Sequence, residues 1–208
     1  RKTEMPYATA TVAVRAETGE VVWSRQLVHH DIWDVDTNSA PTLLDIKKDG
    51  QTIPALIQAT KMGFHFVLNR NTGEPIWPIE ERPYPASDVP GEVAAKTQPY
   101  VPYPEPTIPD QTPPVSKLAD FLSFGQCSRW KARLRDEGRY TPPSIRGSIS
   151  WPATLGGVEW GGGAVDPTTN TYVVNSNVVP QIYTLVPRAE ANKLYGDKLR
   201  APGGYAAQ

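Results

Sequence analysis

One pattern occurs twice in this chain, first as Val12-Ala-Val-Arg-Ala-Glu-Thr-Gly-Glu-Val-Val-Trp23 and again as Phe66-Val-Leu-Asn-Arg-Asn-Thr-Gly-Glu-Pro-Ile-Trp77. Each copy has an apolar run, a polar turn that ends in Thr-Gly-Glu, and a second run that reaches Trp. The two turn glycines, Gly19 and Gly73, are 54 residues apart. A glycine turn between two apolar runs is typical of a β-hairpin, and each Trp is suited to packing against a neighbouring unit. The sequence therefore predicts repeated hairpins.

A third, weaker copy follows as Gly163-Ala-Val-Asp-Pro-Thr-Thr-Asn-Thr-Tyr-Val-Val174, with Asn170 at the turn position of the glycines. Asparagine also tolerates left-handed backbone, so the turn can be kept. A repeat of this length cannot bury its apolar face alone, and stacked four-stranded blades around an axis meet that need. We predict an all-β fold, part of a β-propeller of about three blades. An open arc would leave strand edges unpaired, so we expect the chain to be one part of a larger propeller.

The composition agrees with short strands. The 208 residues include 22 Pro, 16 Gly and 6 Trp, and proline is about twice its average usage of roughly 5%. The 21 Lys and Arg are balanced by 22 Asp and Glu, so the overall charge favours neither nucleic acid nor an anionic membrane as partner. No apolar run approaches the about 20 residues of a membrane helix. The single cysteine, Cys127, excludes an internal disulfide framework.

We divide the chain into four segments. Residues 1–77 hold two blade repeats and the polar loop between them. Residues 78–140 are predicted to be a long extended and helical insertion, with eleven prolines from Pro78 to Pro114 and one or two short helices between Lys117 and Glu137. Residues 141–188 are a further blade, and 189–208 a loop. The stretch from Leu155 to Gly163 is too rich in glycine for a long strand, and suits close approach of backbone to another blade or a ligand.

The densest polar cluster is His29-His-Asp-Ile-Trp-Asp-Val-Asp36, which follows the strand that contains Trp23. Three interpretations are open from the residues alone. The His and Asp side chains can bind a metal, one Asp can be a general base, or the Asp side chains can bond their own backbone in a solvated turn. Trp33, which a simple polar turn does not need, favours a site.

Several motifs in one order resemble the membrane-bound glucose/quinate dehydrogenase branch of the PQQ-dependent (quinoprotein) dehydrogenases. They are His29-His30-Asp31-x-Trp33-Asp34-x-Asp36, Ala59-Thr-Lys61-x-Gly63, Phe66-Val-Leu-x-Arg70-x-Thr-Gly73, Tyr140-Thr-Pro-Pro143, Gly156-Gly-Val-Glu-Trp-Gly-Gly162 and Val165-Asp-Pro167. The resemblance covers most of residues 7 to about 188 and is interrupted in the proline-rich segment and in 118–133. It implies part of an eight-bladed β-propeller.

The resemblance implies that Asp34 is the catalytic base and that Lys61, 27 positions later, lies beside the quinone oxygens of PQQ. The residue types suit that chemistry. A carboxylate can take the hydroxyl proton of an alcohol while hydride passes to the quinone, and a cation stabilises the negative charge that develops there. PQQ carries the redox chemistry, and the protein supplies position and field.

The resemblance also implies that Glu159 and Asn175 lie near PQQ. Both are equally well explained as satisfied polar groups at strand ends. Ca²⁺ would act as a Lewis acid beside PQQ, with Asp34 as one ligand and the remaining calcium ligands outside this chain. The resemblance further implies oxidation of a sugar, a polyol or a cyclic alcohol, a periplasmic location, ubiquinone as electron acceptor, and a membrane anchor, if any, outside this chain.

Two other functions compete with this one. A non-catalytic propeller scaffold would keep the repeats but would need neither the polar cluster nor a lysine 27 residues after Asp34. A metal-dependent hydrolase would use the same cluster to bind Zn²⁺ or Mn²⁺ and would need no quinone. We favour the dehydrogenase, of which this segment alone would be inactive.

Overall fold

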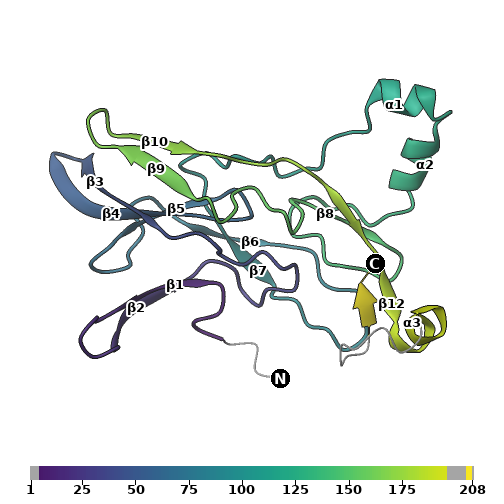
Figure 1. Cartoon of the computed structure of the whole chain (residues 1–208), viewed down its shortest axis with the longest axis horizontal. Helices are drawn as coiled ribbons and strands as arrows, with labels where there is room; N and C mark the ends of the chain where they lie inside the picture. The colour runs from purple at the N-terminus through teal and green to yellow at the C-terminus, as the bar shows by residue number, and fades with distance from the viewer. Residues whose placement is uncertain (1–4, 196–204, 208) are drawn as a thin grey trace.

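The computed structural model describes residues 5–195 and 205–207, and these form small antiparallel sheets with a few short helices (Figure 1). The mostly β fold predicted from the repeats is confirmed. The elements are β1 (Ala10–Val14), β2 (Val21–Gln26), β3 (Thr42–Lys48), β4 (Gln51–Ala59), β5 (His65–Asn69), β6 (Glu80–Pro83), β7 (Thr97–Tyr100), α1 (Lys117–Leu122), α2 (Gln126–Lys131), β8 (Ser148–Ser150), β9 (Gly163–Asp166), β10 (Thr171–Val174), β11 (Gln181–Tyr183), β12 (Leu185–Pro187), α3 (Arg188–Tyr195) and β13 (Tyr205–Ala207).

All three repeats form hairpins as predicted. The first is β1–β2 and the third is β9–β10. The second begins with β5 and turns back through a bridge between Leu68 and Pro75. The turn residues Gly19, Gly73 and Asn170 have φ of 73°, 74° and 54°, so asparagine does occupy the left-handed position that glycine fills elsewhere. The turn chemistry seen in the sequence therefore determines where each hairpin reverses.

Trp23 joins the first repeat to the second. Its indole N–H donates to the carbonyl of Arg70 at 3.0 Å, and its ring lies over the turn glycine of the next repeat. A Cβ added at Gly73 would lie 2.7 Å from the Trp23 ring. The tryptophan at the end of one repeat thus packs against the glycine turn of the following one, as its position in the repeat predicts.

The central sheet has the order β3-β4-β5, and both of its faces are buried along the second half of β4 and most of β5. Along β4 and β5, Leu56, Phe66 and Leu68 belong to one core, while Ala55, Ile57 and Val67 belong to the other. Alternate side chains of a strand point to opposite faces, so an almost continuous apolar run fills both cores. The hairpin β9–β10 lies beside β3, where the Thr42 hydroxyl donates to the carbonyl of Gly163 at 2.8 Å (Figure 1).

The proline-rich insertion contains one element that the sequence did not predict. Strands β6 and β7 pair from Glu80 with Tyr100 to Pro83 with Thr97. The two short helices α1 and α2 were predicted and form. Among the described residues no helix is long and apolar enough to span a membrane.

The C-terminal segment differs from the predicted loop, because Arg188–Tyr195 form helix α3. The strand β13, at Tyr205–Ala207, pairs with β12. The rest of the predicted loop, residues 196–204 and 208, lies outside the described residues. Helix α3 follows Pro187 directly, and proline favours the start of a helix, since its missing N–H costs nothing there.

Two buried arginines hold the insertion in place. The Arg139 guanidinium bonds the carbonyls of Met62 and Ile108 and the carboxylate of Asp110, at 2.5 Å for Ile108 and 2.9 Å for Asp110. It also lies 4.4 Å from the ring centre of Phe64. Five donors in a rigid fork suit a residue that must satisfy several carbonyls at once. Arg139 therefore holds the chain around Ile108 against the turn that connects β4 to β5.

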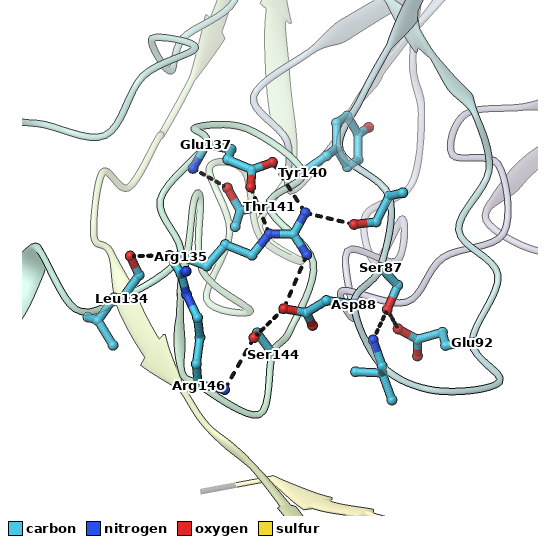
Figure 2. Close-up of polar contacts among 12 residues, drawn as sticks. Ser87, Asp88, Glu92, Leu134, Arg135, Glu137, Tyr140, Thr141, Ser144 and Arg146 are labelled. Carbon is cyan, nitrogen blue, oxygen red and sulfur yellow. Dashed lines mark hydrogen bonds and ion pairs between the residues drawn. The ribbon is translucent and has the colours of Figure 1, made fainter.

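Arg135 makes a second such junction (Figure 2). Its guanidinium pairs with Glu137 at 2.8 Å, donates to the carbonyl of Ala86 at 2.7 Å and lies 3.8 Å from Asp88. Asp88 in turn accepts from the Ser144 hydroxyl at 2.8 Å. The loop around residues 86–88 and the segment 135–144 are thereby fixed to each other.

The contact of Trp23 with Gly73 can be tested with a pair of glycines. Gly73→Ala in the full-length protein should lower the free energy of unfolding by about 1 kcal/mol for the left-handed backbone and by about 1–3 kcal/mol more for the clash with Trp23. Gly19→Ala is the matched control, because Gly19 has almost the same φ and nothing within 4 Å of its added Cβ. Denaturant titration measures both. Equal losses in the two variants would mean that the Trp23 contact contributes nothing.

Candidate functional site

The polar loop 29–36 is shaped by Asp31. Its carboxylate accepts the backbone N–H groups of Trp33 at 2.8 Å and Val35 at 2.9 Å. Burial raises the pKa of the Asp31 carboxyl, and these two backbone donors oppose that rise only in part. Asp31 is therefore bonded to its own loop, as the solvated-turn interpretation expects for one of the aspartates.

Trp33 anchors the same loop to the core. The side chain is buried, its indole N–H donates to the carbonyl of Tyr140 at 3.1 Å, and the two rings meet edge to face with centroids 5.0 Å apart. A buried indole normally needs a partner for its N–H, and here a segment more than a hundred residues away supplies it. Trp33 thus fixes the position of the residue that follows it.

Asp34 follows Trp33 in a strained backbone conformation with φ of 62°. Its side chain is exposed, and no hydrogen bond ties its carboxylate to another of the described residues. Left-handed backbone is uncommon outside glycine and often marks a functional position. The loop therefore presents an exposed carboxylate without a hydrogen-bond partner, and such a carboxylate is open to accept a proton from a bound group.

Lys61 lies beside this loop, in the turn between β4 and β5. Its ammonium group is 2.5 Å from the Asp36 carboxylate and donates to the carbonyl of Asp34 at 3.1 Å. The lysine side chain is only 9% exposed. A buried charge needs such a partner, so the pairing of the two motifs, 27 residues apart, is a real contact in the fold.

The charges around Lys61 keep it protonated. Burial by itself lowers the pKa of its ammonium, and the hydrogen bond and charge of Asp36 act in the opposite direction. The charges of Asp34 and Glu159 add to the effect of Asp36, and together they raise the pKa above its usual value. Lys61 is therefore a permanent cation at neutral pH, enclosed by carboxylates.

The glycine stretch brings Glu159 to this cation. The N–H of Gly157 donates to the carbonyl of Lys61 at 2.5 Å, and a Cβ added at Gly156 would lie 2.9 Å from the Lys61 Cα. The backbone of the glycine stretch was predicted to approach another blade or a ligand closely, and in the structure it approaches the β4–β5 turn. The Glu159 carboxylate accepts from the Asn38 side chain at 2.6 Å.

Of the four residues predicted for the site, the structure brings three together. Asp34, Lys61 and Glu159 share one cluster, as the electrostatic coupling of Lys61 requires. Asn175 is exposed just beyond β10, and it is not among the groups that influence the charge of Lys61. Its neighbours bond elsewhere, Ser176 to Thr107 at 3.1 Å and the Asn177 N–H to the carbonyl of Gly157 at 2.7 Å. The proposed role of Asn175 therefore rests on its strand-end position alone.

Sequence reasoning assigned no role to Asp36 or Asn38, although the structure places both in the cluster. Asp36 belongs to the motif Trp33-Asp34-x-Asp36, so a signal was present. Asn38 had none, because its partner Glu159 is 121 residues away. Long-range pairs of this kind are fixed only by the fold.

His29 of the loop has partners outside the cluster. The His29 imidazole is 2.8 Å from Gln26 and 3.1 Å from Glu81. Within residues 5–195 and 205–207 no three His, Cys, Asp or Glu side chains gather to hold a metal ion. The hydrolase alternative, which needs His29 or His30 as a metal ligand, thus gains no support from the geometry.

The cluster suits an acceptor-rich polar ligand such as the quinone cofactor implied by the resemblance. Two buried hydroxyls of the same loop, Thr37 and Ser39, have no hydrogen-bond partner among the described residues. Buried hydroxyls without a partner are rare, and a ligand is one explanation for them. The Lys61 ammonium is a donor in the cluster, and Asp34 supplies an open acceptor.

Known proteins similar to this chain include quinoprotein and quinone-linked dehydrogenases. Residues 1–206 match the family described as PQQ: glucose/ethanol/alcohol dehydrogenase, β-propeller domain. The chain is 41% identical over 196 residues to the quinoprotein glucose dehydrogenase of Gluconobacter oxydans (strain 621H), covering 92% of this chain and 24% of that protein. It is 40% identical over 172 residues to the quinate/shikimate dehydrogenase (quinone) of Acinetobacter baylyi (strain ATCC 33305 / BD413 / ADP1), covering 81% and 21%.

Solved structures support the fold. The quinohemoprotein alcohol dehydrogenase of Comamonas testosteroni superposes with a TM-score of 0.54 at 20% identity, over 86% of this chain and 21% of that one. The europium-containing methanol dehydrogenase gives 0.53 at 22% identity, over 86% and 25%. The chain spans about a quarter of the length of the glucose dehydrogenases that it matches.

The ion pair at Lys61 makes a testable prediction. Asp36→Asn should lower the pKa of Lys61, because the charge that opposes desolvation is removed. The pH dependence of acylation of the Lys61 amine, followed by peptide mass spectrometry, should then move to lower pH. Asp45→Asn is the control, since it breaks a comparable ion pair with Arg70, at 3.0 Å, outside the cluster. An unchanged Lys61 profile in Asp36→Asn would show that this pair does not form in solution.

Proposed function

Since the chain belongs to the PQQ β-propeller family of glucose/ethanol/alcohol dehydrogenases, we propose that it is part of a quinoprotein dehydrogenase that oxidises a sugar, a polyol or a cyclic alcohol. The observation that carries this proposal is the cluster in which the unpartnered Asp34 carboxylate stands next to the buried Lys61 cation. Relatives named as glucose, glycerol and quinate/shikimate dehydrogenases support the substrate class. This activity is proposed for the whole protein. The chain itself matches about a quarter of the length of the Gluconobacter oxydans glucose dehydrogenase.

Asp34 is the proposed base. A general base must be within hydrogen-bond reach of the proton it takes and ionised at working pH. The Asp34 carboxylate is exposed, and the buried Trp33 and the left-handed backbone hold it in place. It would accept the hydroxyl proton of the bound alcohol at one of its carboxylate oxygens.

Lys61 is the proposed electrostatic partner of the cofactor. PQQ, when bound, supplies the quinone that accepts hydride from the alcohol carbon. The Lys61 ammonium, kept charged by Asp36, would stabilise negative charge on the quinone oxygens. Because Asp36 and the carbonyl of Asp34 already fix the ammonium, little reorganisation is needed when that charge develops.

Glu159 and Asn175 are proposed as further contacts to the cofactor. Glu159 is oriented by Asn38 and lies close enough to influence the charge of Lys61. Asn175 follows β10, where the backbone returns to Gly157 through Asn177. The hydroxyls of Thr37 and Ser39, which have no hydrogen-bond partner among the described residues, are possible further donors close in sequence to Asp36.

We also propose Ca²⁺ as a second cofactor, with Asp34 as one ligand. Calcium takes several oxygen ligands, and the described residues offer no group of three acidic or imidazole side chains. The remaining ligands would therefore come from other parts of the protein. A periplasmic location and ubiquinone as electron acceptor complete the proposal, on the strength of the sequence resemblance.

A non-catalytic propeller scaffold is the alternative function. Such a module would need the repeats and the docking of Trp23 on Gly73. It would have no need of a buried cation beside carboxylates, because burying such charges carries a desolvation cost. The cluster around Lys61 therefore favours the enzyme.

The role of Asp34 can be tested in the full-length protein. Asp34→Asn should lower kcat by about 10²–10⁴-fold, because the base is lost, while PQQ binding followed by absorbance stays largely intact. Asp49→Asn is a matched control, since Asp49 is also exposed and also has left-handed backbone, with φ of 51°.

Two other outcomes would contradict this proposal. If Asp34→Asn loses PQQ binding and turnover to the same degree, Asp34 holds the cofactor and is not the base. If the unaltered full-length protein binds no PQQ in the presence of Ca²⁺, the scaffold alternative is favoured.

A further inference from the structure

The helical hairpin formed by α1 and α2 exposes most of its large apolar side chains. They are between 59% and 89% exposed, and they comprise Leu118, Phe121, Leu122, Phe124 and Trp130. Neither helix has a single buried residue. In α1, Leu118, Phe121 and Leu122 have the i, i+3, i+4 spacing that places them on one face. The face that would normally pack onto a core is therefore turned to the outside.

The same hairpin concentrates positive charge. Lys117, Arg129, Lys131 and Arg133 lie between residues 116 and 134, where Asp120 is the only acidic residue. The Asp120 carboxylate accepts the N–H of Ser128 at 2.8 Å and lies near Arg129, which lowers the pKa of Asp120. Lys117, Arg129 and Arg133 are exposed. The nearly neutral charge of the whole chain conceals this local excess.

The hairpin stands away from the sheets at one end of the molecule (Figure 1). Both ends of the hairpin are nevertheless tied down. Lys131 donates to the carbonyl of Pro113 at 2.8 Å and pairs with Asp136 at 3.1 Å, and the Thr112 hydroxyl donates to Asp136 at 2.7 Å. The hairpin is thus a fixed projection.

An apolar cavity of about 330 Å³ lies under α2. Trp130 of α2 lines the cavity, together with Ile149 of β8 and Ile182 of β11. Prolines 113 and 180 complete much of the wall. The apolar surface of the hairpin is therefore continuous with a recess at its base.

We propose that the α1–α2 hairpin is an interfacial anchor that inserts its apolar side chains into an anionic phospholipid surface, with its basic side chains at the headgroups. Aromatic and aliphatic side chains interleaved with Lys and Arg match the acyl boundary and the anionic headgroups together. Trp130, with an apolar ring and one polar N–H, suits the interface between them.

Depth-sensitive fluorescence tests the proposal in the full-length protein. Leu118→Cys, labelled with an environment-sensitive dye, is compared with Val93→Cys, which has almost the same exposure, 64% against 67%, in a loop far from the hairpin in sequence. The reactive cysteines, Cys127 included, are first changed to serine. Mixed phosphatidylcholine and phosphatidylglycerol vesicles that carry a chain-labelled quenching lipid should quench the dye at 118 and leave the dye at 93 unaffected.

The comparison of two positions separates insertion of the hairpin from attachment of the protein by some other segment. Equal quenching at 118 and 93, or none at either, would overturn the proposal. A dye at 118 that is already shielded from water without vesicles would also overturn it, because the hairpin would then be covered by protein, either another part of the chain or a second copy.

The charged part of the surface has its own test. Changing Lys117, Arg129 and Arg133 to Gln should raise the concentration of mixed vesicles at half-maximal quenching by roughly 100-fold, since each cation near an anionic surface contributes about fivefold. Vesicles of phosphatidylcholine alone should not distinguish the variant from the parent. Oxidation of substrate with a soluble dye acceptor should be unchanged, so failure here is independent of the proposed dehydrogenase activity. An unchanged concentration for mixed vesicles would overturn the electrostatic part.

Discussion

The backbone contact between Gly157 and the β4–β5 turn holds the two parts of the site together. The 2.5 Å hydrogen bond from the Gly157 N–H to the carbonyl of Lys61 is formed between segments almost a hundred residues apart. Any side chain at Gly157 would meet Ile108 and the backbone of Gly63. Because glycine alone permits this approach, it allows Glu159 to lie near Lys61, which belongs to the turn between β4 and β5.

The electrostatics of the cluster follow from that packing. One buried cation, Lys61, lies among the charges of Asp36, Asp34 and Glu159, so the region is negative overall and the lysine proton is held firmly. Only Asp36 forms a direct ion pair, which leaves the Asp34 carboxylate free of partners. The arrangement thus separates two tasks. One aspartate fixes the cation, and the other stays available at the surface of the loop.

The parts of the fold that depend on local chemistry could be predicted. The hairpins follow from the glycine turns. Even the turn with Asn170 in place of glycine could be predicted, because asparagine is one of the few residues that tolerate left-handed backbone. The pairing of β6 with β7 could not be predicted from the sequence. Pro83 and Pro99 argue against a strand ladder, because proline fits a strand only where no backbone N–H is needed. The motif Trp33-Asp34-x-Asp36 gave a signal for Asp36, but its partner Lys61 is 25 residues away. The role of Asn38 depends on a contact across 121 residues, which no local pattern encodes.

The buried arginines explain how one chain can carry both a rigid cluster and a projecting hairpin. Arg139 joins residues 108–110 to the carbonyl of Met62, the residue that follows Lys61. Arg135, which follows the hairpin in the sequence, donates to the carbonyl of Ala86 (Figure 2). The chain between these fixed points, residues 111–134, can therefore extend outward without disturbing the turn that carries Lys61. Among the described residues, no hydrogen bond or ion pair joins that segment to Lys61, whose ammonium group has Asp34 and Asp36 as its polar partners. Changes to the exposed face of α1 and α2 should consequently act on the surface the hairpin meets and leave the geometry of the cluster as it is.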